Sequence, residues 1–356
     1  MTKIEWTERT WNPIVGCSLV SPGCTNCYAM QMAYRLAAMT NESFQRGHGA
    51  TTAHYLGTVQ RVNGHAVWTG KVRLASDATI LAPLKRRKPT MYFVNSMGDL
   101  FHEQIPDAWI DRVFAVMALA PQHTFQVLTK RSARMRDYLT EVRETWCHRG
   151  FSTPGNERIH EAALAITGEG WLPETPGEWP LKNVWLGVST EDQARAYERI
   201  PDLLATPAAV RFISAEPLLG PIDLSRWLEM GGLNTDLGLS NPGLDWVIAG
   251  GESGTGARPM HPDWARSLRD QCAAAGTPFF FKQWGAWKDG SDFATDDSVR
   301  IVCNDGRVLK PDLASIEVAD RVQPVPPAHP TMMRRVGKAR AGRLLDGVEH
   351  NGMPAR

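Results

Sequence analysis

Residues 124–142 read TFQVLTKRSARMRDYLTEV and contain the unit that decides the fold. The first six residues form a short, largely apolar run, and Ser132–Val142 continues with the periodicity of an amphipathic helix. A short run that is apolar on both faces is typical of a strand in a parallel sheet covered on both sides. The stretch therefore predicts one strand followed directly by one helix.

The same unit recurs along the chain. Six further runs of about five residues are rich in Val, Ile or Phe: Asn12–Gly16, Met91–Asn95, Val184–Ser189, Val210–Ala215, Trp246–Ala249 and Pro278–Lys282. Helical patterns lie between the runs at Ala29–Met39, Pro106–Leu119, Glu191–Leu204 and His261–Ala275. This alternation predicts an α/β fold with a parallel sheet, arranged as an open doubly wound sheet or as a full or partial barrel.

Three stretches do not fit the alternation and are rich in Gly, Pro, Trp and charge. We interpret residues 43–88, 145–181 and 222–244 as insertions in the loops between strands and helices. We expect residues 1–284 to form the α/β domain and residues 285–356 to form a polar C-terminal extension.

Composition excludes several classes of protein. Among the 356 residues, Lys and Arg number 39 against 38 Asp and Glu, which argues against a histone-like polybasic protein and against an acidic tail. No apolar stretch approaches the roughly 18 residues that cross a bilayer. We therefore expect a cytoplasmic protein without a membrane partner. In that reducing compartment, the six cysteines are expected to be thiols or metal ligands.

The strongest chemical signal is a three-cysteine loop. Cys17, Cys24 and Cys27 fall within eleven residues, with six residues and then two between them, after a predicted strand and before a predicted helix. Pro22 and Gly23 supply a turn that can direct the three sulfurs toward one point. Thiolates are the ligands preferred by zinc and by iron–sulfur clusters.

The number of thiols bears on the choice of metal. Structural zinc takes four protein ligands, and the next histidine after the loop is the distant His48. A [4Fe–4S] cluster with one open iron needs three cysteines, so the count favours such a cluster. Zinc with a distant fourth ligand, or three buried free thiols, are the alternatives.

A three-cysteine loop after the first strand of a repeated βα chain resembles the radical S-adenosylmethionine (SAM) superfamily. The spacing usual there is three residues and then two, whereas here it is six and then two. The resemblance spans roughly residues 11–284 and implies a partial (βα)6-type parallel barrel with two cofactors, a [4Fe–4S] cluster and SAM.

More closely, the chain resembles a group of phage and prophage three-Cys-motif proteins. Its motifs run in order along nearly the whole chain: IEWT, TWNPIVGC, SPGCTNCYA, FVNSMGDLFHE, VLTKR, WLGVST, AEPLLGP, VIAGGESG, FFFKQWG and AGRLLDG. This resemblance implies a phage protein and does not supply a substrate.

Polar residues follow the predicted strands, where barrel enzymes place their reactive groups. Given the resemblance, Asp99 and Ser96 would accept hydrogen bonds from the SAM ammonium, Lys130 would meet the carboxylate, and Ser189 and Glu191 would meet the ribose. Spore photoproduct lyase, a radical SAM enzyme that repairs DNA, offers the closest analogy. It similarly has Ser, Lys and Ser after its second, third and fourth strands and a Tyr after its last cluster cysteine.

Three residues are candidates for catalysis, namely Tyr28, His102 and Glu252. Tyr28 directly follows Cys27, and His102 lies near the predicted strand ends. Glu252 belongs to a Gly-Gly-Glu segment, which in radical SAM proteins lies near the second strand and here follows the sixth. The SAM-ammonium role is therefore not transferred to Glu252, and its glycines would allow the backbone to approach adenine or substrate closely.

The sequence thus predicts a radical SAM enzyme that cleaves SAM and abstracts hydrogen from a substrate. The resemblance also implies a reductant such as a flavodoxin or ferredoxin. The alternative is a nucleic-acid-binding protein in which zinc holds the three cysteines without catalysis.

The resemblance to spore photoproduct lyase and the phage context suggest DNA or RNA, or a nucleotide made from one, as a partner. The run 85–88 reads KRRK, and residues 331–356 hold six Lys or Arg against two Asp or Glu. Both segments would suit a polyanion, although a solvated loop at 85–88 and a tail that packs by its arginine stems are the more ordinary explanation.

Overall fold

A computed structural model of the protein describes the chain except for short segments near its start, its end and within several loops. The described residues are 4–148, 157–168, 179–228, 233–234, 239–240, 243–290, 297–310 and 330–355.

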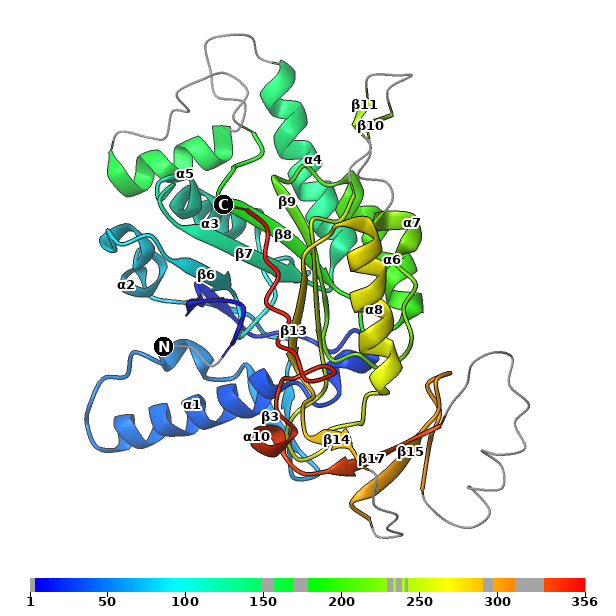
Figure 1. The fold of residues 1–356 in the computed structure, drawn as a ribbon. Coiled ribbons are helices and arrows are strands. Elements are labelled where there is room, and N and C mark those ends of the chain that lie inside the picture. The colour runs from blue at the N-terminus through cyan, green and yellow to red at the C-terminus, as the bar shows by residue number, and fades with distance from the viewer. Residues whose placement is uncertain are drawn as a thin grey trace. The chain divides into compact units, whose positions relative to one another are not determined.

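The largest sheet has seven strands (Figure 1). These are β1 (Arg9–Trp11), β6 (Met91–Val94), β7 (Thr124–Thr129), β8 (Val184–Ser189), β9 (Val210–Ala215), β12 (Trp246–Gly250) and β13 (Phe279–Gln283). Their spatial order, β1-β6-β7-β8-β9-β12-β13, follows the order of the chain, and the pairs β1–β6, β6–β7, β7–β8, β9–β12 and β12–β13 are parallel.

This order decides between the two architectures left open by the sequence. A doubly wound sheet reverses its strand order at a switch point, and this sheet does not reverse. Among the described strands, β1 and β13 stand at opposite ends of the order, so the sheet does not close on itself. The expected α/β fold of the partial parallel barrel type is confirmed.

The burial of the strands explains why the apolar pattern of the sequence predicted most of them. Every residue of β6, β8 and β12 is buried, as expected for a parallel sheet covered on both faces. The predicted bounds of the strands at residues 124–129, 184–189 and 210–215 agree with those of β7, β8 and β9.

The first strand of the sheet does not lie where the sequence predicted it. We expected a strand over Asn12–Gly16, whereas β1 is Arg9–Trp11, and Ile14–Val15 forms β2 in a separate antiparallel pair with β5 (Arg73–Leu74). β1 is an edge strand with an exposed Arg9, so it lacks the continuous apolar pattern used to find the others.

The helices follow the strands as expected. They are α1 (Tyr28–Gln45), α3 (Asp107–Ala118), α4 (Ser132–His148), α6 (Gln193–Ala205) and α8 (Pro262–Ala275). In α8 the local cause is clear, because Pro262 occupies its first position and the His261 ring accepts a hydrogen bond from the Asp263 backbone at 3.1 Å. Gly276 ends this helix with a φ of 70°.

The predicted insertions carry short elements of their own. These are η2 (Ala53–Tyr55), β3 (Val59–Val62), β4 (His65–Trp68), α2 (Asp77–Ile80), η3 (Pro83–Lys85), α5 (Glu157–Thr167), α7 (Ser225–Leu228), β10 (Leu233–Asn234) and β11 (Leu239–Ser240). Trp68 and Ala66 of β4 share an apolar cluster with Met30 and Ala33 of α1, so the β3–β4 hairpin is anchored to that helix. Parts of the predicted insertions 145–181 and 222–244 lie outside the described residues.

The C-terminal region forms a second, antiparallel sheet in the order β14-β17-β15-β16. Its elements are β14 (Trp287–Asp289), β15 (Val299–Val302), β16 (Val308–Leu309) and β17 (Thr331–Arg335), followed by α10 (Lys338–Ala341). The end of the chain then runs along β13, where Gly352 donates to Phe279 at 2.9 Å and His350 accepts from Phe281 at 3.0 Å.

The chain divides into two compact units. The first comprises Met1–Val188 and Pro201–Arg211, and the second comprises Ser189–Ile200 and Phe212–Arg356. In the ranges that the structure describes, no helix combines the length and the apolar character needed to cross a membrane.

Candidate functional site

The three-cysteine loop lies in the first unit, beside the end of β6. Gly16 opens the loop with a φ of 96°, and a Cβ there would stand 2.1 Å from the Lys71 carbonyl oxygen, so only glycine fits. Its backbone N–H donates to the Met97 carbonyl at 3.1 Å. Cys24 then ends η1 (Pro22–Cys24), and Cys27 directly precedes α1 at its N-cap position.

The surroundings of the thiols combine burial with positive charge. Burial and the Asp99 carboxylate raise the pKa of Cys17 to about 12, against the opposing charge of Arg131. Burial also raises the pKa of Cys27, while the backbone N–H of Ala29 and the Lys130 ammonium oppose this rise. The Cys17 and Cys27 thiols therefore hold their protons in the metal-free protein, yet cations and a backbone donor that favour thiolates lie near them.

A metal bound at these thiols would replace their protons. A thiol-bound cluster displaces the protons and carries net negative charge, which the Lys130 and Arg131 side chains would offset. The Cys17 and Cys27 thiols each lie within electrostatic range of Cys24, and Cys24 Sγ lies 3.8 Å from the Ser21 hydroxyl. In the part of the chain that the structure describes, no three Cys, His, Asp or Glu side chains stand close enough to hold a metal.

Asp99 organises the ends of β6 and β7. One carboxylate oxygen accepts from the Phe101 backbone at 3.0 Å and from the Thr129 hydroxyl at 2.7 Å. The other accepts from the Lys130 backbone at 3.1 Å and from Arg131 Nη1 at 3.0 Å. Asp99 is 5% exposed, so its acceptor capacity is used inside the protein, which leaves little for the expected SAM ammonium.

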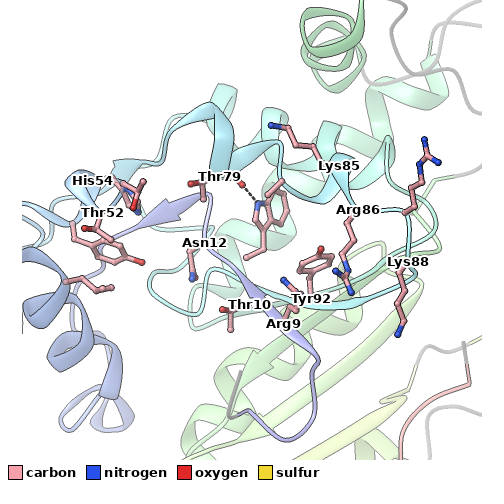
Figure 2. A pocket seen from close by; sticks show the side chains of 16 residues that line it. Arg9, Thr10, Asn12, Thr52, His54, Thr79, Lys85, Arg86, Lys88 and Tyr92 are labelled. Carbon is pink, nitrogen blue, oxygen red and sulfur yellow. Dashed lines mark hydrogen bonds between the residues drawn. The ribbon is translucent and has the colours of Figure 1, made fainter. Parts of the chain in front are cut away.

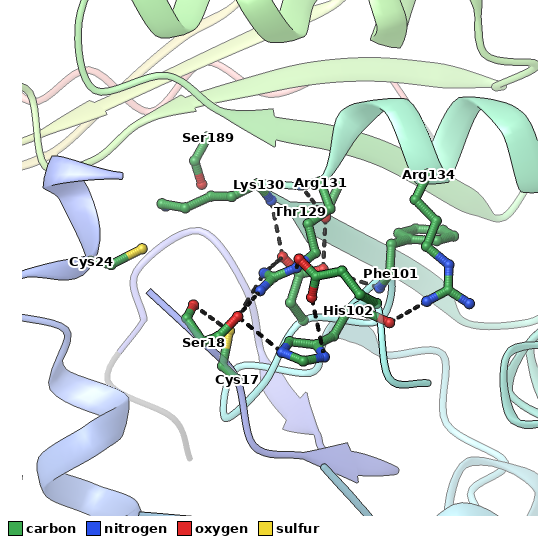
Figure 3. Close-up of polar contacts among 12 residues, drawn as sticks. Cys17, Ser18, Cys24, Phe101, His102, Thr129, Lys130, Arg131, Arg134 and Ser189 are labelled. Carbon is green, nitrogen blue, oxygen red and sulfur yellow. Dashed lines mark hydrogen bonds and ion pairs between the residues drawn. The ribbon is translucent and has the colours of Figure 1, made fainter. Parts of the chain in front are cut away.

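Arg131 connects this network to the cysteine loop, as Figure 3 shows. Besides Asp99, its buried guanidinium reaches Cys17 Sγ at 3.6 Å, Ser18 Oγ at 2.7 Å and Glu103 Oε1 at 3.1 Å. One side chain thus joins the end of β7, the segment after β6 and the first cysteine. We call Ser18, Asp99, His102, Glu103, Thr129 and Arg131 the Asp99–Arg131 cluster.

His102 belongs to the same cluster. Its Nδ1 accepts from the Gln104 backbone at 3.2 Å, so its Nε2 carries the proton and donates to Ser18 Oγ at 3.0 Å. Burial, followed by the charge of Arg131, lowers the pKa of His102, which keeps the ring neutral at neutral pH. Because Ser18 Oγ accepts from both Arg131 and His102, its own hydrogen is left to point elsewhere.

The predicted residues Tyr28 and Ser96 are brought together. The Tyr28 hydroxyl donates to the Ser96 carbonyl at 3.1 Å, and the Ser96 hydroxyl donates to Asn12 Oδ1 at 3.1 Å. Tyr28 is 53% exposed, so its ring remains accessible beside Cys27. The first turn of α1 is thereby tied to the loop that follows β6.

Ser189 and Glu191, the residues predicted to bind ribose, belong to the second unit. Glu191 Oε2 pairs with Arg199 Nη1 at 3.0 Å, and both side chains are fully buried. The same nitrogen donates to the Ser189 carbonyl at 2.8 Å. Arg199 therefore orders the end of β8, and the ribose roles of Ser189 and Glu191 stay predictions.

Glu252, the third catalytic candidate, also belongs to the second unit and is held by Arg258. Arg258 Nη2 lies 2.6 Å from Glu252 Oε1, and Arg258 Nε lies 2.8 Å from Oε2. A Cβ on Gly251 would stand 2.0 Å from the Trp284 carbonyl oxygen. The glycines before Glu252 thus allow close approach to the chain's own backbone after β13.

Sequence reasoning missed Arg131 and Ser18, the residues that join the cluster to the cysteine loop. Each is directly adjacent to a predicted site residue, Lys130 and Cys17 respectively. The available signal was the position of Arg131 directly after a predicted strand, because a charged residue close to the buried end of a strand requires a partner. Those partners are 28 to 114 residues away in the chain.

Comparison with curated proteins and with solved structures found no match. A comparison with protein families matched residues 1–354 to a family described as "Protein of unknown function (DUF5131)". Because this match covers almost the whole chain, the protein belongs to the DUF5131 family.

Proposed function

We propose that the protein is a radical SAM-type enzyme that binds a [4Fe–4S] cluster through Cys17, Cys24 and Cys27. The observation that carries the proposal is the contact of Arg131 with both Cys17 Sγ and Asp99. It brings the cysteine loop to the carboxyl ends of β6 and β7, where parallel barrel enzymes bind their ligands.

Residues of the chain would have separate roles toward the cluster and toward SAM. The three thiolates hold the cluster, which when bound supplies the electron for reductive cleavage of SAM. Arg131 offsets the negative charge at Cys17, and the Lys130 ammonium, which lies within electrostatic range of Cys27, meets the SAM carboxylate. The Asp99 carboxylate already accepts hydrogen bonds from donors of the chain itself. Its role is therefore to position Arg131, with which it pairs, and not to contact SAM.

Two groups remain for the substrate side of the reaction, the exposed Tyr28 and the half-buried Ser18. Tyr28 presents its ring next to Cys27, with its hydroxyl fixed on the Ser96 carbonyl. Ser18 holds a hydroxyl hydrogen that neither Arg131 nor His102 engages, since both of these donate to its oxygen. A reductant such as a ferredoxin or flavodoxin would supply the electron.

Anaerobic reconstitution with iron and sulfide tests the proposal. We expect a brown protein that retains iron, with Cys17→Ala, Cys24→Ala and Cys27→Ala each losing most of it. Cys272→Ala is the control, because Cys272 is buried in α8 of the second unit. Reduced protein with SAM should release 5′-deoxyadenosine. A colourless protein with stoichiometric zinc would contradict the cluster.

Lys130 provides a second readout on the same protein. Lys130→Ala should weaken SAM binding roughly ten- to a hundredfold, the value of one charge-assisted hydrogen bond, while the cluster spectrum is unchanged. Lys182→Ala, at an exposed lysine, is the matched control. Equal SAM affinity in both variants would remove Lys130 from the site.

A further inference from the structure

A pocket of about 810 Å³ lies along β1 in the first unit, outside the cysteine loop (Figure 2). Its walls come from β1, from residues 51–55 around η2, and from residues 79–92 around η3 and β6. A volume of this order is within the range of ligand-binding pockets and far exceeds the space of a single small anion. The pocket meets the surroundings of the cysteine loop at Asn12, which accepts from Ser96.

The charge of the lining is entirely positive. Five lining residues are basic and none is acidic: Arg9, Lys85, Arg86, Arg87 and Lys88. We call this site the basic pocket. Among the described residues, none of the five makes an ion pair, and four of them are exposed. Elsewhere in this unit, arginines such as Arg112, Arg131 and Arg136 pair with carboxylates.

Arg86 is fixed at the inner side of the pocket. Its Nε donates to Thr90 Oγ1 at 2.5 Å, which leaves its terminal nitrogens without an acceptor among the described residues. Figure 2 shows Arg86 and Arg9 beside Tyr92, and the charges of both oppose the rise in the pKa of Tyr92 caused by its burial. The nearby Glu8 carboxylate accepts a hydrogen bond from the Met91 backbone N–H at 2.8 Å, and its charge adds to the rise in the pKa of Tyr92.

The opposite side of the pocket offers neutral donors and acceptors. Thr51, Thr52 and His54 line this side, and burial lowers the pKa of His54, so its ring is neutral at neutral pH. The Thr52 hydroxyl also contacts the Thr40 hydroxyl at 2.7 Å. The pocket thus has cations on one side and hydroxyl groups with a neutral imidazole on the other. Such a lining suits a ligand in which anionic oxygens are joined to a polar, uncharged part. Arginine and lysine with hydroxyl groups are the common partners of phosphate.

The second basic segment predicted from the sequence has a different role. Arg335 donates to the Gly254 carbonyl at 2.9 Å, while Arg343 lies over the Phe280 ring at 5.2 Å and pairs with Glu349 at 3.7 Å. These arginines thus make contacts within the second unit. Of the two basic segments predicted from the sequence, residues 85–88 are the ones that line the basic pocket, together with Arg9.

We propose that the basic pocket binds the phosphate groups of nucleotides, either free or within a single-stranded nucleic acid. The unpaired cations would contact the phosphates, and the threonine hydroxyls and His54 would contact the sugar and base. This proposal goes beyond the cluster chemistry and does not depend on it, because the pocket residues include none of the three cysteines.

Fluorescence anisotropy on the full-length, metal-free protein tests the proposal. The probes are a labelled single-stranded 20-mer and a labelled ATP, each titrated at low salt. The variant is Arg9→Gln/Lys85→Gln/Lys88→Gln, at three exposed residues of the pocket. The control Lys71→Gln/Lys182→Gln/Lys288→Gln removes the same charge from exposed lysines outside it. Unchanged circular dichroism shows that both variants fold.

We expect the pocket variant to bind at least one probe on the order of tenfold more weakly, and the control to bind as the wild type does. For the 20-mer, the slope of log affinity against log salt should fall by about 0.7 per lost phosphate contact. Tight ATP binding that competes with the 20-mer would identify free nucleotides as the source, and binding of the 20-mer alone would identify a polynucleotide. No binding of either probe, equal losses in both variants, or equal competition by polyglutamate would overturn the proposal.

Discussion

The Asp99–Arg131 cluster and the basic pocket lie in the same unit and both contain arginine. The two sites differ in whether the positive charge is buried and paired or exposed and unpaired. In the cluster, the Arg131 guanidinium is buried and reaches Asp99, Glu103, Ser18 and Cys17. In the pocket, Arg9, Lys85, Arg87 and Lys88 are exposed and have no ion pair among the described residues.

This difference in burial and pairing has a different consequence for each site. Buried charges need partners because water no longer solvates them, so the cluster holds a fixed geometry in the absence of any ligand. Exposed cations without ion pairs are solvated by water, so the pocket keeps its positive charge available to the anionic ligand that we propose. Its unpaired charges also repel one another, which opposes folding weakly.

The largest effect should come from breaking the buried pair. Asp99→Asn removes the charge that balances Arg131 while keeping the size of the side chain. Loss of one partner of a buried pair costs about 3–5 kcal/mol, and Glu103 should hold the loss to the lower end of this range. Urea unfolding of the metal-free protein measures it.

Glu103→Gln is the matched control for this change, since that carboxylate also contacts Arg131 but is 62% exposed. Exposed pairs contribute about 0–1 kcal/mol. Equal losses for Asp99→Asn and Glu103→Gln would show that burial does not separate the two carboxylates.

A smaller effect should follow acidification. Because burial and Arg131 lower the pKa of His102 in the folded protein, the unfolded chain binds more protons as the pH falls below its ordinary value. The His102 contribution to stability is thus fully present above about pH 6.5 and is lost as the pH falls toward its folded pKa.

Urea unfolding at pH 7.5 and 5.5 measures this contribution. The difference in the free energy of unfolding between the two pH values should be smaller in His102→Gln than in the wild type. His48→Gln, at an exposed histidine, should leave the difference unchanged. Identical differences in all three proteins would mean that His102 gains its proton as readily folded as unfolded.

The smallest change in the free energy of unfolding should come from a substitution in the basic pocket, and it should be a gain in stability, whereas Asp99→Asn causes a loss. Lys85→Gln removes one of several like charges, so the free energy of unfolding should change by no more than about 0.5 kcal/mol and should rise at low salt. Salt at 0.5 M should remove the gain by screening. A clear destabilisation would show that Lys85 has a partner in solution and that the contrast between the two sites is wrong.

Local patterns predicted most of the fold. β7, β8 and β9 were delimited correctly because each is a short apolar run buried in the sheet. The exception is β1, where an exposed Arg9 and an edge position remove that pattern. In the candidate site, the sequence identified Asp99 and His102 but not Arg131, because its partners come from distant segments.

The sequence by itself determined the parallel α/β fold, the strand and helix order and the position of the cysteine loop, since these depend on residues close together in the chain. Only the tertiary structure decided that Asp99 is saturated by its own neighbours and that Arg131 meets Cys17 across 114 residues. It also decided that Arg9 joins the run 85–88 in one pocket while Arg335 and Arg343 are occupied. Spacing along the chain limits only local contacts, whereas the pairing of charges depends on which segments folding brings together.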